Sequence, residues 1–274
     1  MPLSALLLVL AAAFIHALWN MLLARARDSE SATAVVLVVA LVVYAPVAAV
    51  LWRADASVWP YVLASGTLHL VYFALLAAAA YHRSELSVVY PLARGTAPVL
   101  VLLVGVVALG ASRSATQAAG VCVVGVGVLL VRGIRRPAAG SGVGFGLAIA
   151  VVIAAYTLND NSGVEHANPI VYLELSMILP AIAYTAAMGR LKGLPALRAE
   201  LNVSAVLAGL ATFGAYGLVL EALARAPAAP VAAARETSVV IAAVLARAFL
   251  KEPVTAARFA GAAVVAGGVA LVSL

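Results

Sequence analysis

Two arginines, Arg94 and Arg235, stand inside long apolar segments of the chain. An ionisable side chain within a membrane span is costly and usually faces a cavity or a charged partner. Each arginine lies about nine residues into its segment, roughly 13 Å along a helix, and therefore near the midplane of a bilayer. A guanidinium offers a planar fork of donors that suits carboxylate, phosphate or phosphonate. We therefore expect each arginine to contact either an anionic solute or an internal carboxylate.

Three carboxylates within the apolar segments are candidates for charge partners or for coupling transport to protons: Glu236, Glu174 and Asp160. Glu236 follows Arg235 directly and lies about 100° further around a helix, so the two cannot pair squarely. Glu236 could instead meet Arg94, and it is the best candidate for a proton-sensitive group.

Polar and aromatic residues recur at positions i, i+3 and i+4, which share one face of a helix. Each aromatic residue alone could serve packing or interfacial anchoring, but five such faces indicate one shared cavity. The faces comprise His16, Trp19 and Asn20; His69, Tyr72 and Phe73; Tyr90 and Arg94; Tyr156, Asn159 and Asp160; Thr212 and Tyr216. The expected substrate-binding residues are Arg94, Arg235, His16, Trp19, Asn20, Tyr72, Tyr90, Tyr156 and Tyr216.

The elements that position these residues are membrane-spanning helices. The chain is 65% hydrophobic and only 10% charged, whereas a soluble domain is about half apolar and about a quarter charged. A spanning helix needs roughly 20 mostly apolar residues. Candidate segments are 3–23, 32–52, 60–80, 86–109, 115–131, 143–162, 169–188, 202–222, 228–249 and 254–274. The sequence therefore predicts an all-α integral membrane protein with ten transmembrane helices in a lipid bilayer.

The segments fall into two related halves. A shift of 141 residues places ArgGlyThr (94–96) over ArgGluThr (235–237), Gly120 over Gly261, and Gly127 over Gly268. Two five-helix repeats, residues 1–137 and 138–274, follow from this match. An odd number of spans per half gives the halves opposite orientations, and inverted repeats commonly build transporters with a site near the midplane.

The positive charges predict an orientation. Of the 17 lysines and arginines, two are the arginines inside spans, 12 fall on one side and three on the other. The 12 are Arg25, Arg27, Arg83, Arg132, Arg135, Arg136, Arg190, Lys192, Arg198, Arg247, Lys251 and Arg258; the three are Arg53, Arg113 and Arg225. Because positive charge favours the cytoplasm, this distribution predicts that both termini lie outside.

Other classes of site find no support in the sequence. The basic residues lie between apolar segments and fix orientation, so the net charge of +6 does not indicate nucleic-acid binding. The single cysteine, Cys122, excludes an internal disulfide framework and a cysteine-cluster metal site. The four histidines lack metal-ligand spacing, and there is no nucleophile motif or phosphate loop. We expect no metal, no cofactor and no enzymatic activity.

Four short segments carry a resemblance to a known family. They are HisAlaLeuTrpAsn (16–20), TyrProLeuAlaArgGlyThrAlaPro (90–98), ArgGluThrSer (235–238) and PheLeuLysGluPro (249–253). With the ten-span plan, they make the whole chain resemble the drug/metabolite transporter superfamily, EamA type. The resemblance implies a secondary carrier with alternating access and a central cavity lined by spans one, three, four, six, eight and nine. It also implies termini in the cytoplasm, against the charge count.

These observations together predict a secondary active transporter in a bacterial inner membrane, acting as a monomer or homodimer. It would export or exchange a small polar metabolite that is anionic or zwitterionic. Two alternatives stay open on the sequence alone. One is a membrane enzyme acting on a lipid-linked substrate, and the other is a membrane scaffold subunit that transports nothing.

Overall fold

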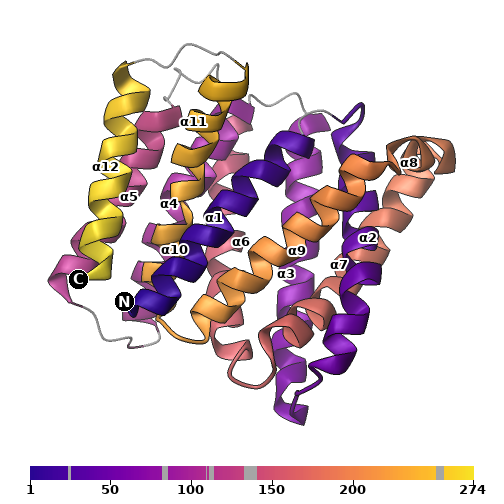
Figure 1. The fold of residues 1–274 in the computed structure, drawn as a ribbon, viewed down its shortest axis with the longest axis horizontal. Coiled ribbons are helices and arrows are strands. Elements are labelled where there is room, and N and C mark those ends of the chain that lie inside the picture. The colour runs from indigo at the N-terminus through magenta and orange to yellow at the C-terminus, as the bar shows by residue number, and fades with distance from the viewer. Residues whose placement is uncertain (24–25, 82–85, 109, 111–113, 133–140, 251–255) are drawn as a thin grey trace.

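Helices make up nearly all of the described chain. The computed structural model describes residues 1–23, 26–81, 86–108, 110, 114–132, 141–250 and 256–274. Within these ranges lie twelve α-helices and one short 3-10 helix, η1 (Ala56–Val58). The α-helices are α1 (Leu3–Leu23), α2 (Ser29–Val50), α3 (Trp59–Tyr81), α4 (Leu86–Val107), α5 (Ala115–Arg132), α6 (Ser141–Gly163), α7 (Pro169–Lys192), α8 (Leu194–Glu200), α9 (Val203–Leu223), α10 (Ala228–Arg235), α11 (Thr237–Leu250) and α12 (Ala256–Ser273) (Figure 1).

Most of these helices are suited to a bilayer. In the described chain, seven helical stretches are long and apolar enough to cross a membrane, and three further apolar helices are shorter. Large apolar side chains such as Leu7, Val42 and Ile182 point outward and are more than half exposed. Lipid covers such a surface, and helices satisfy their own backbone hydrogen bonds within it. The chain is a multi-pass membrane protein.

The described residues form twelve α-helices, two more than the ten predicted spans. Nine of the ten predicted segments each correspond to one long helix. The remaining segment, 228–249, is divided at Glu236 into α10 and α11. There the amide of Glu236 bonds to the carbonyl of Ala233 (3.1 Å), three residues back, which tightens the backbone. The other addition, α8, starts after Gly193, whose φ of 83° ends α7 in a conformation that favours glycine.

Short polar residues start three of the long helices. The side chain of Asp28 accepts a hydrogen bond from the amide of Glu30 at the start of α2. Asn168 and Asn202 cap α7 and α9 in the same way. These side chains satisfy amides that have no partner within the helix. The caps therefore fix where each helix begins, at the ends of the bundle.

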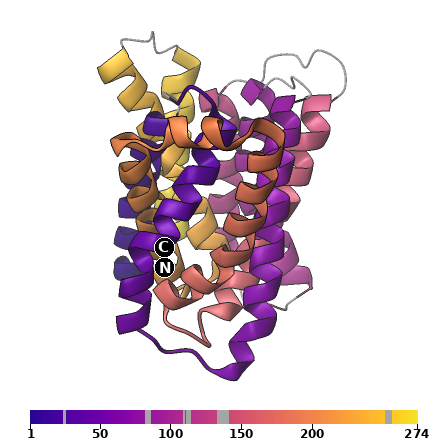
Figure 2. The same cartoon turned by 90° about the vertical axis from the view of Figure 1, so that its right-hand side faces the viewer.

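Helix α1 begins and α12 ends at the same end of the bundle, as both views show (Figures 1 and 2). The Met1 ammonium donates a hydrogen bond to the carbonyl of Ser273 (3.2 Å). The start of α2 and the short α8 lie at the opposite end. Six residues of the charge count lie outside the described residues: Arg25, Arg83, Arg113, Arg135, Arg136 and Lys251.

Helices α5 and α12 pack against each other through glycines. A Cβ atom on Gly120 would lie 2.8 Å from the carbonyl oxygen of Gly268, and one on Gly127 would lie 3.1 Å from that of Gly261. The later residue of α5, Gly127, contacts the earlier residue of α12, Gly261, so the two helices are antiparallel. The 141-residue shift turns either contact into the other. Each contact therefore has a counterpart in the other half of the chain.

We predict that Gly268→Ala lowers the thermal unfolding temperature of the purified protein in detergent. The added Cβ would lie 2.7 Å from the Val124 Cγ2 atom and 2.9 Å from the Gly120 carbonyl oxygen. Overpacking of this kind costs about 1–3 kcal/mol. The neighbouring Gly267→Ala is the matched control, because its Cβ meets nothing within 4 Å. Equal unfolding temperatures for the two variants would contradict a close α5–α12 contact.

Candidate functional site

A cavity of about 460 Å³ occupies the centre of the bundle. Its walls come from α1, α2, α3, α4, α6, α7, α9, α10 and α11. All nine residues predicted to bind substrate line it: Arg94, Arg235, His16, Trp19, Asn20, Tyr72, Tyr90, Tyr156 and Tyr216. The resemblance had implied walls from six spans, and the structure adds α2 and α7. The packing of the helices thus brings side chains that are far apart in sequence to one place.

The cavity extends from the middle of the bundle toward one end. Its lining reaches Asn20 near the end of α1 and Ser29 and Glu30 at the start of α2. The end of α1 and the start of α2 lie at the end of the bundle opposite the N-terminus (Figure 1). In the other direction the lining stops at Ala12 and Val219, within α1 and α9. We call the Ser29–Glu30 end the mouth.

Arg94 is neutralised within the protein. Its Nη1 donates to Glu236 Oε1 at 3.1 Å, and the two side chains are 13% and 2% exposed. Its Nη2 lies against His16 Nε2. The Trp19 indole donates to the other His16 ring nitrogen, Nδ1, at 3.1 Å. Because a neutral imidazole accepts at only one nitrogen, His16 accepts from either Trp19 or Arg94 at a time.

Arg235 has fewer partners. The residue is 8% exposed, yet its side chain forms part of the cavity wall. Its Nη2 donates one long hydrogen bond, 3.4 Å, to the Tyr156 hydroxyl. Its Nε is buried without a hydrogen-bond partner. In the described chain no carboxylate forms an ion pair with Arg235.

Aromatic rings form one wall beside Arg235. His69 stacks on Tyr156 with ring centroids 4.3 Å apart and meets the edge of Tyr216 at 5.5 Å. Tyr72 meets Tyr156 edge-on at 6.2 Å. The His69 Nδ1 donates to the carbonyl of Ser65 at 2.9 Å, which leaves Nε2 as the accepting nitrogen of the neutral ring. This wall offers flat apolar surface with a few polar edges.

Asp160 lies one helical turn after Tyr156 on α6 and is fully buried. The Tyr172 hydroxyl donates to its Oδ1 (2.7 Å) and the Tyr216 hydroxyl to its Oδ2 (2.5 Å). The neighbouring Asn159 amide donates to the carbonyl of Tyr61 (2.9 Å). These bonds join α3, α6, α7 and α9 at the closed end of the cavity, which we call the floor. Asn159 and Asp160 were predicted on the cavity face, but neither lines the cavity.

The other predicted carboxylates lie apart from the lining. Glu236 is 1% exposed and reaches the cavity only through Arg94. Glu174, on α7, does not line the cavity and pairs with neither arginine in the described residues. Its Oε2 is buried without a hydrogen-bond partner. Of the candidate charge partners, the structure therefore brings only Glu236 to an arginine.

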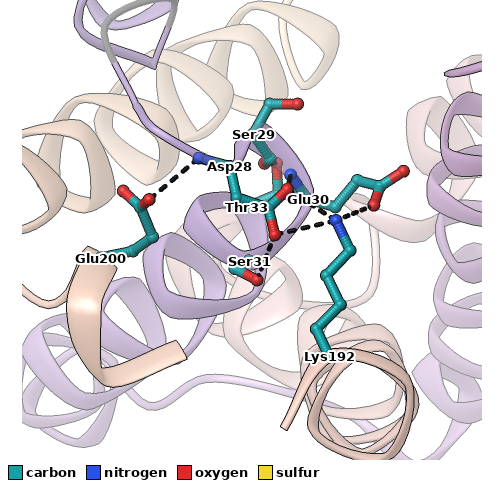
Figure 3. Close-up of polar contacts among 7 residues, drawn as sticks. All are labelled: Asp28, Ser29, Glu30, Ser31, Thr33, Lys192 and Glu200. Carbon is teal, nitrogen blue, oxygen red and sulfur yellow. Dashed lines mark hydrogen bonds and ion pairs between the residues drawn. The ribbon is translucent and has the colours of Figure 1, made fainter. Parts of the chain in front are cut away.

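The mouth carries a charged cluster that sequence reasoning missed (Figure 3). The Lys192 ammonium, at the end of α7, contacts Asp28 Oδ1 (2.6 Å) and Oδ2 (2.8 Å) and pairs with Glu30. Glu200 of α8 accepts from the Asp28 amide at 3.0 Å. Burial disfavours the charged Asp28 carboxyl, but hydrogen bonds from Lys192 and Ser31 outweigh it and lower the pKa of Asp28.

Residues 25–30 read as a loop between spans, so Glu30 was not expected on the cavity. The available signal was an aspartate followed by Ser29, Glu30 and Ser31, which is typical of a helix start. The described residues contain no group of three or more histidine, cysteine, aspartate or glutamate side chains that could hold a metal ion. The cavity is therefore best described as an aromatic pocket containing two guanidinium groups.

Comparisons with known proteins agree with this architecture. The model of the EamA-like transporter family matches residues 3–133 and, a second time, residues 140–274. A solved structure described as "Crystal structure of protein" has the same fold, with a TM-score of 0.74, 16% sequence identity, and coverage of 99% of this chain and 98% of that chain. No curated protein matches the chain. Because the two family matches together span nearly the whole sequence, the chain belongs to the EamA-like transporter family, whose members are membrane transporters of the drug/metabolite transporter superfamily.

Proposed function

We propose that the protein is a secondary active transporter that exports or exchanges a small anionic or zwitterionic metabolite. The observation that carries this proposal is the central cavity, whose wall includes two arginines at positions related by the sequence repeat. A cavity of about 460 Å³ has the size of a small-molecule site. Guanidinium groups within a membrane span suit a solute that carries an acidic group.

The architecture we propose is ten spans in two inverted repeats, 1–137 and 138–274. The seven long and three shorter apolar helices support this count if α10 and α11 together cross once. The two family matches support the division into halves. The antiparallel α5–α12 contacts, exchanged by the 141-residue shift, support their inversion. A broken helix beside a midplane site is a recurrent feature of inverted-repeat transporters.

Alternating access would work between the mouth and the floor. The cavity reaches the mouth and is closed at the floor by Asp160 and its two tyrosines. Tyr216 both lines the cavity and donates to Asp160, so a bound solute touches a member of the floor. To open the opposite side, α6 would separate from α7 and α9, and the floor hydrogen bonds would break.

We predict that Arg94→Ala and Arg235→Ala each abolish transport while insertion and expression stay near normal. The first leaves the buried Glu236 carboxylate without its partner, and the second removes the other guanidinium from the cavity. Lysine at either position should restore little activity, because it lacks the planar fork. A thermal-shift screen of anionic and zwitterionic metabolites identifies the ligand, and counterflow of that ligand into proteoliposomes measures transport.

Arg225→Ala is the control for loss of one positive charge, since Arg225 is partly exposed and pairs only with Glu221 in the described chain. Wild-type counterflow in both cavity variants would contradict the anionic site. A ligand that stabilises the protein but never crosses the vesicle membrane would contradict transport itself.

The orientation of the protein in the inner membrane of a bacterium gives a second prediction. We expect a periplasm-active reporter fused after Leu274 to be active, because the sequence-based count assigns 12 of the cations to the side opposite both termini. The mouth would then open to the cytoplasm. Reporter fusions in the 135–140 segment are the matched test, and they should be inactive. The reverse pattern would place both termini in the cytoplasm.

Coupling to protons gives a third prediction, which rests on Glu236. Protonation would remove its charge and release Arg94, so the ion pair can respond to the proton gradient. Glu236→Gln keeps the shape but removes this change of charge. We expect the variant to exchange substrate across vesicles and to lose its response to an imposed pH gradient. Full gradient-driven accumulation would exclude Glu236 from coupling, and a variant that misfolds would identify the pair as structural.

A further inference from the structure

We infer that the two cavity arginines have different roles, and that Arg235 alone anchors the acidic group of the substrate. The inference rests on the proposed function and sharpens it. The acidic group, a carboxylate, phosphate or phosphonate, would sit at the junction of α10 and α11 beside Tyr156. The rest of the molecule would extend along the aromatic wall toward the mouth.

Arg94 does not need a solute to neutralise it. Glu236 Oε1 accepts from its Nη1 at 3.1 Å, and the carboxylate is almost completely enclosed. His16 lies against its second terminal nitrogen. A second anion placed here would meet the negative charge of Glu236 within a few ångströms, which is unfavourable in a site with little water. Arg94 is therefore committed to a contact inside the protein.

Arg235 is in the opposite situation. A guanidinium has five N–H donors, yet within the described residues Arg235 makes one hydrogen bond, at 3.4 Å. Its Nε has no partner and no carboxylate is paired with it. Both oxygens of Asp160 already accept from tyrosine hydroxyls. The Glu236 carboxylate attracts Arg235 from a distance but does not form an ion pair with it. A buried charge without a directly paired counter-ion is unfavourable, and a ligand in the cavity is the group that can supply one.

The sequence repeat explains why only one arginine has a carboxylate. The 141-residue shift that places Arg94 over Arg235 also places Gly95 over Glu236. A Cβ atom on Gly95 would lie 3.0 Å from both the carbonyl oxygen of Gly125 and the Cγ of Leu129. No side chain fits there without a shift of α4 or α5. The first half therefore supplies no carboxylate that mirrors Glu236 and could face Arg235.

The geometry at Arg235 suits an acidic group. Its guanidinium belongs to the cavity wall, and the Tyr156 hydroxyl next to it can donate a further hydrogen bond. Charge-assisted hydrogen bonds of this kind are stronger than neutral ones. The stack of His69 on Tyr156 fixes the ring that carries this hydroxyl. An anion bound here would thus be held by a guanidinium and a positioned hydroxyl.

Inorganic phosphate tests the assignment without knowledge of the natural substrate. The purified full-length protein in detergent is unfolded thermally over a phosphate titration at constant ionic strength. We expect a saturable rise in unfolding temperature for the wild-type protein. Arg235→Gln should raise the half-saturating phosphate concentration at least about tenfold, the loss expected for a hydrogen-bonded charged group. The double variant R94Q/E236Q removes the ion pair without changing net charge and should raise it less than about threefold.

Arg225→Gln is the matched control, with the same substitution at a partly exposed site, and should leave the phosphate titration unchanged. If Arg235→Gln does not fold, Arg235→Lys should keep a saturable but weaker response. Loss of saturation in the double variant with retention in Arg235→Gln would overturn the inference and leave the anionic cavity standing, with Arg94 as its anchor. Absence of saturable binding in the wild-type protein would remove the anionic substrate class as well, whereas transport is scored separately by counterflow.

Discussion

A charge inside a bilayer is costly unless it faces a cavity or has a charged partner, and the Arg94–Glu236 ion pair supplies such a partner across the two halves. The pair joins α4 of the first half to the α10–α11 junction of the second, so it fixes how the halves face each other. The central cavity lies beside this contact. Removing one partner would leave the other charge buried and unpaired, which is unfavourable.

The polar groups at the two ends of the cavity differ in kind. At the mouth, Lys192 holds Asp28 and Glu30 in a partly exposed cluster, where water and salt weaken each ion pair. At the floor, Asp160 is enclosed by tyrosines and has no access to water. Breaking the ion pairs of the mouth therefore costs little free energy, whereas opening the floor requires new hydrogen-bond partners for the buried Asp160 carboxylate. Tyr216 both lines the cavity and donates to Asp160, so a solute in the cavity can affect the hydrogen bonds of the floor.

The positions of most helices could be predicted from the sequence, because a membrane-spanning helix must have a certain length and must be mostly apolar. Helical spacing also brought the predicted residues to one cavity, since an i, i+4 face such as Tyr90 and Arg94 stays together in any packing. The orientation of Asp160 was not accessible, because neighbouring helices decided which side of α6 faces the cavity. The break at Glu236 was missed as well, since an unbroken apolar window hides a local change to three-residue hydrogen bonding. Glu30 was missed because a short polar stretch between spans reads as a loop.

The neighbouring positions of the start of α1 and the end of α12 have a consequence for chain connectivity. A short peptide could join these two ends, and the chain could be opened between α5 and α6 without moving any helix. The resulting circular permutant would begin with the second half and carry its new ends at the mouth side of the bundle. In such a permutant the second half would be synthesised first, and the ends would face the opposite side of the membrane while the packing of the helices stayed the same.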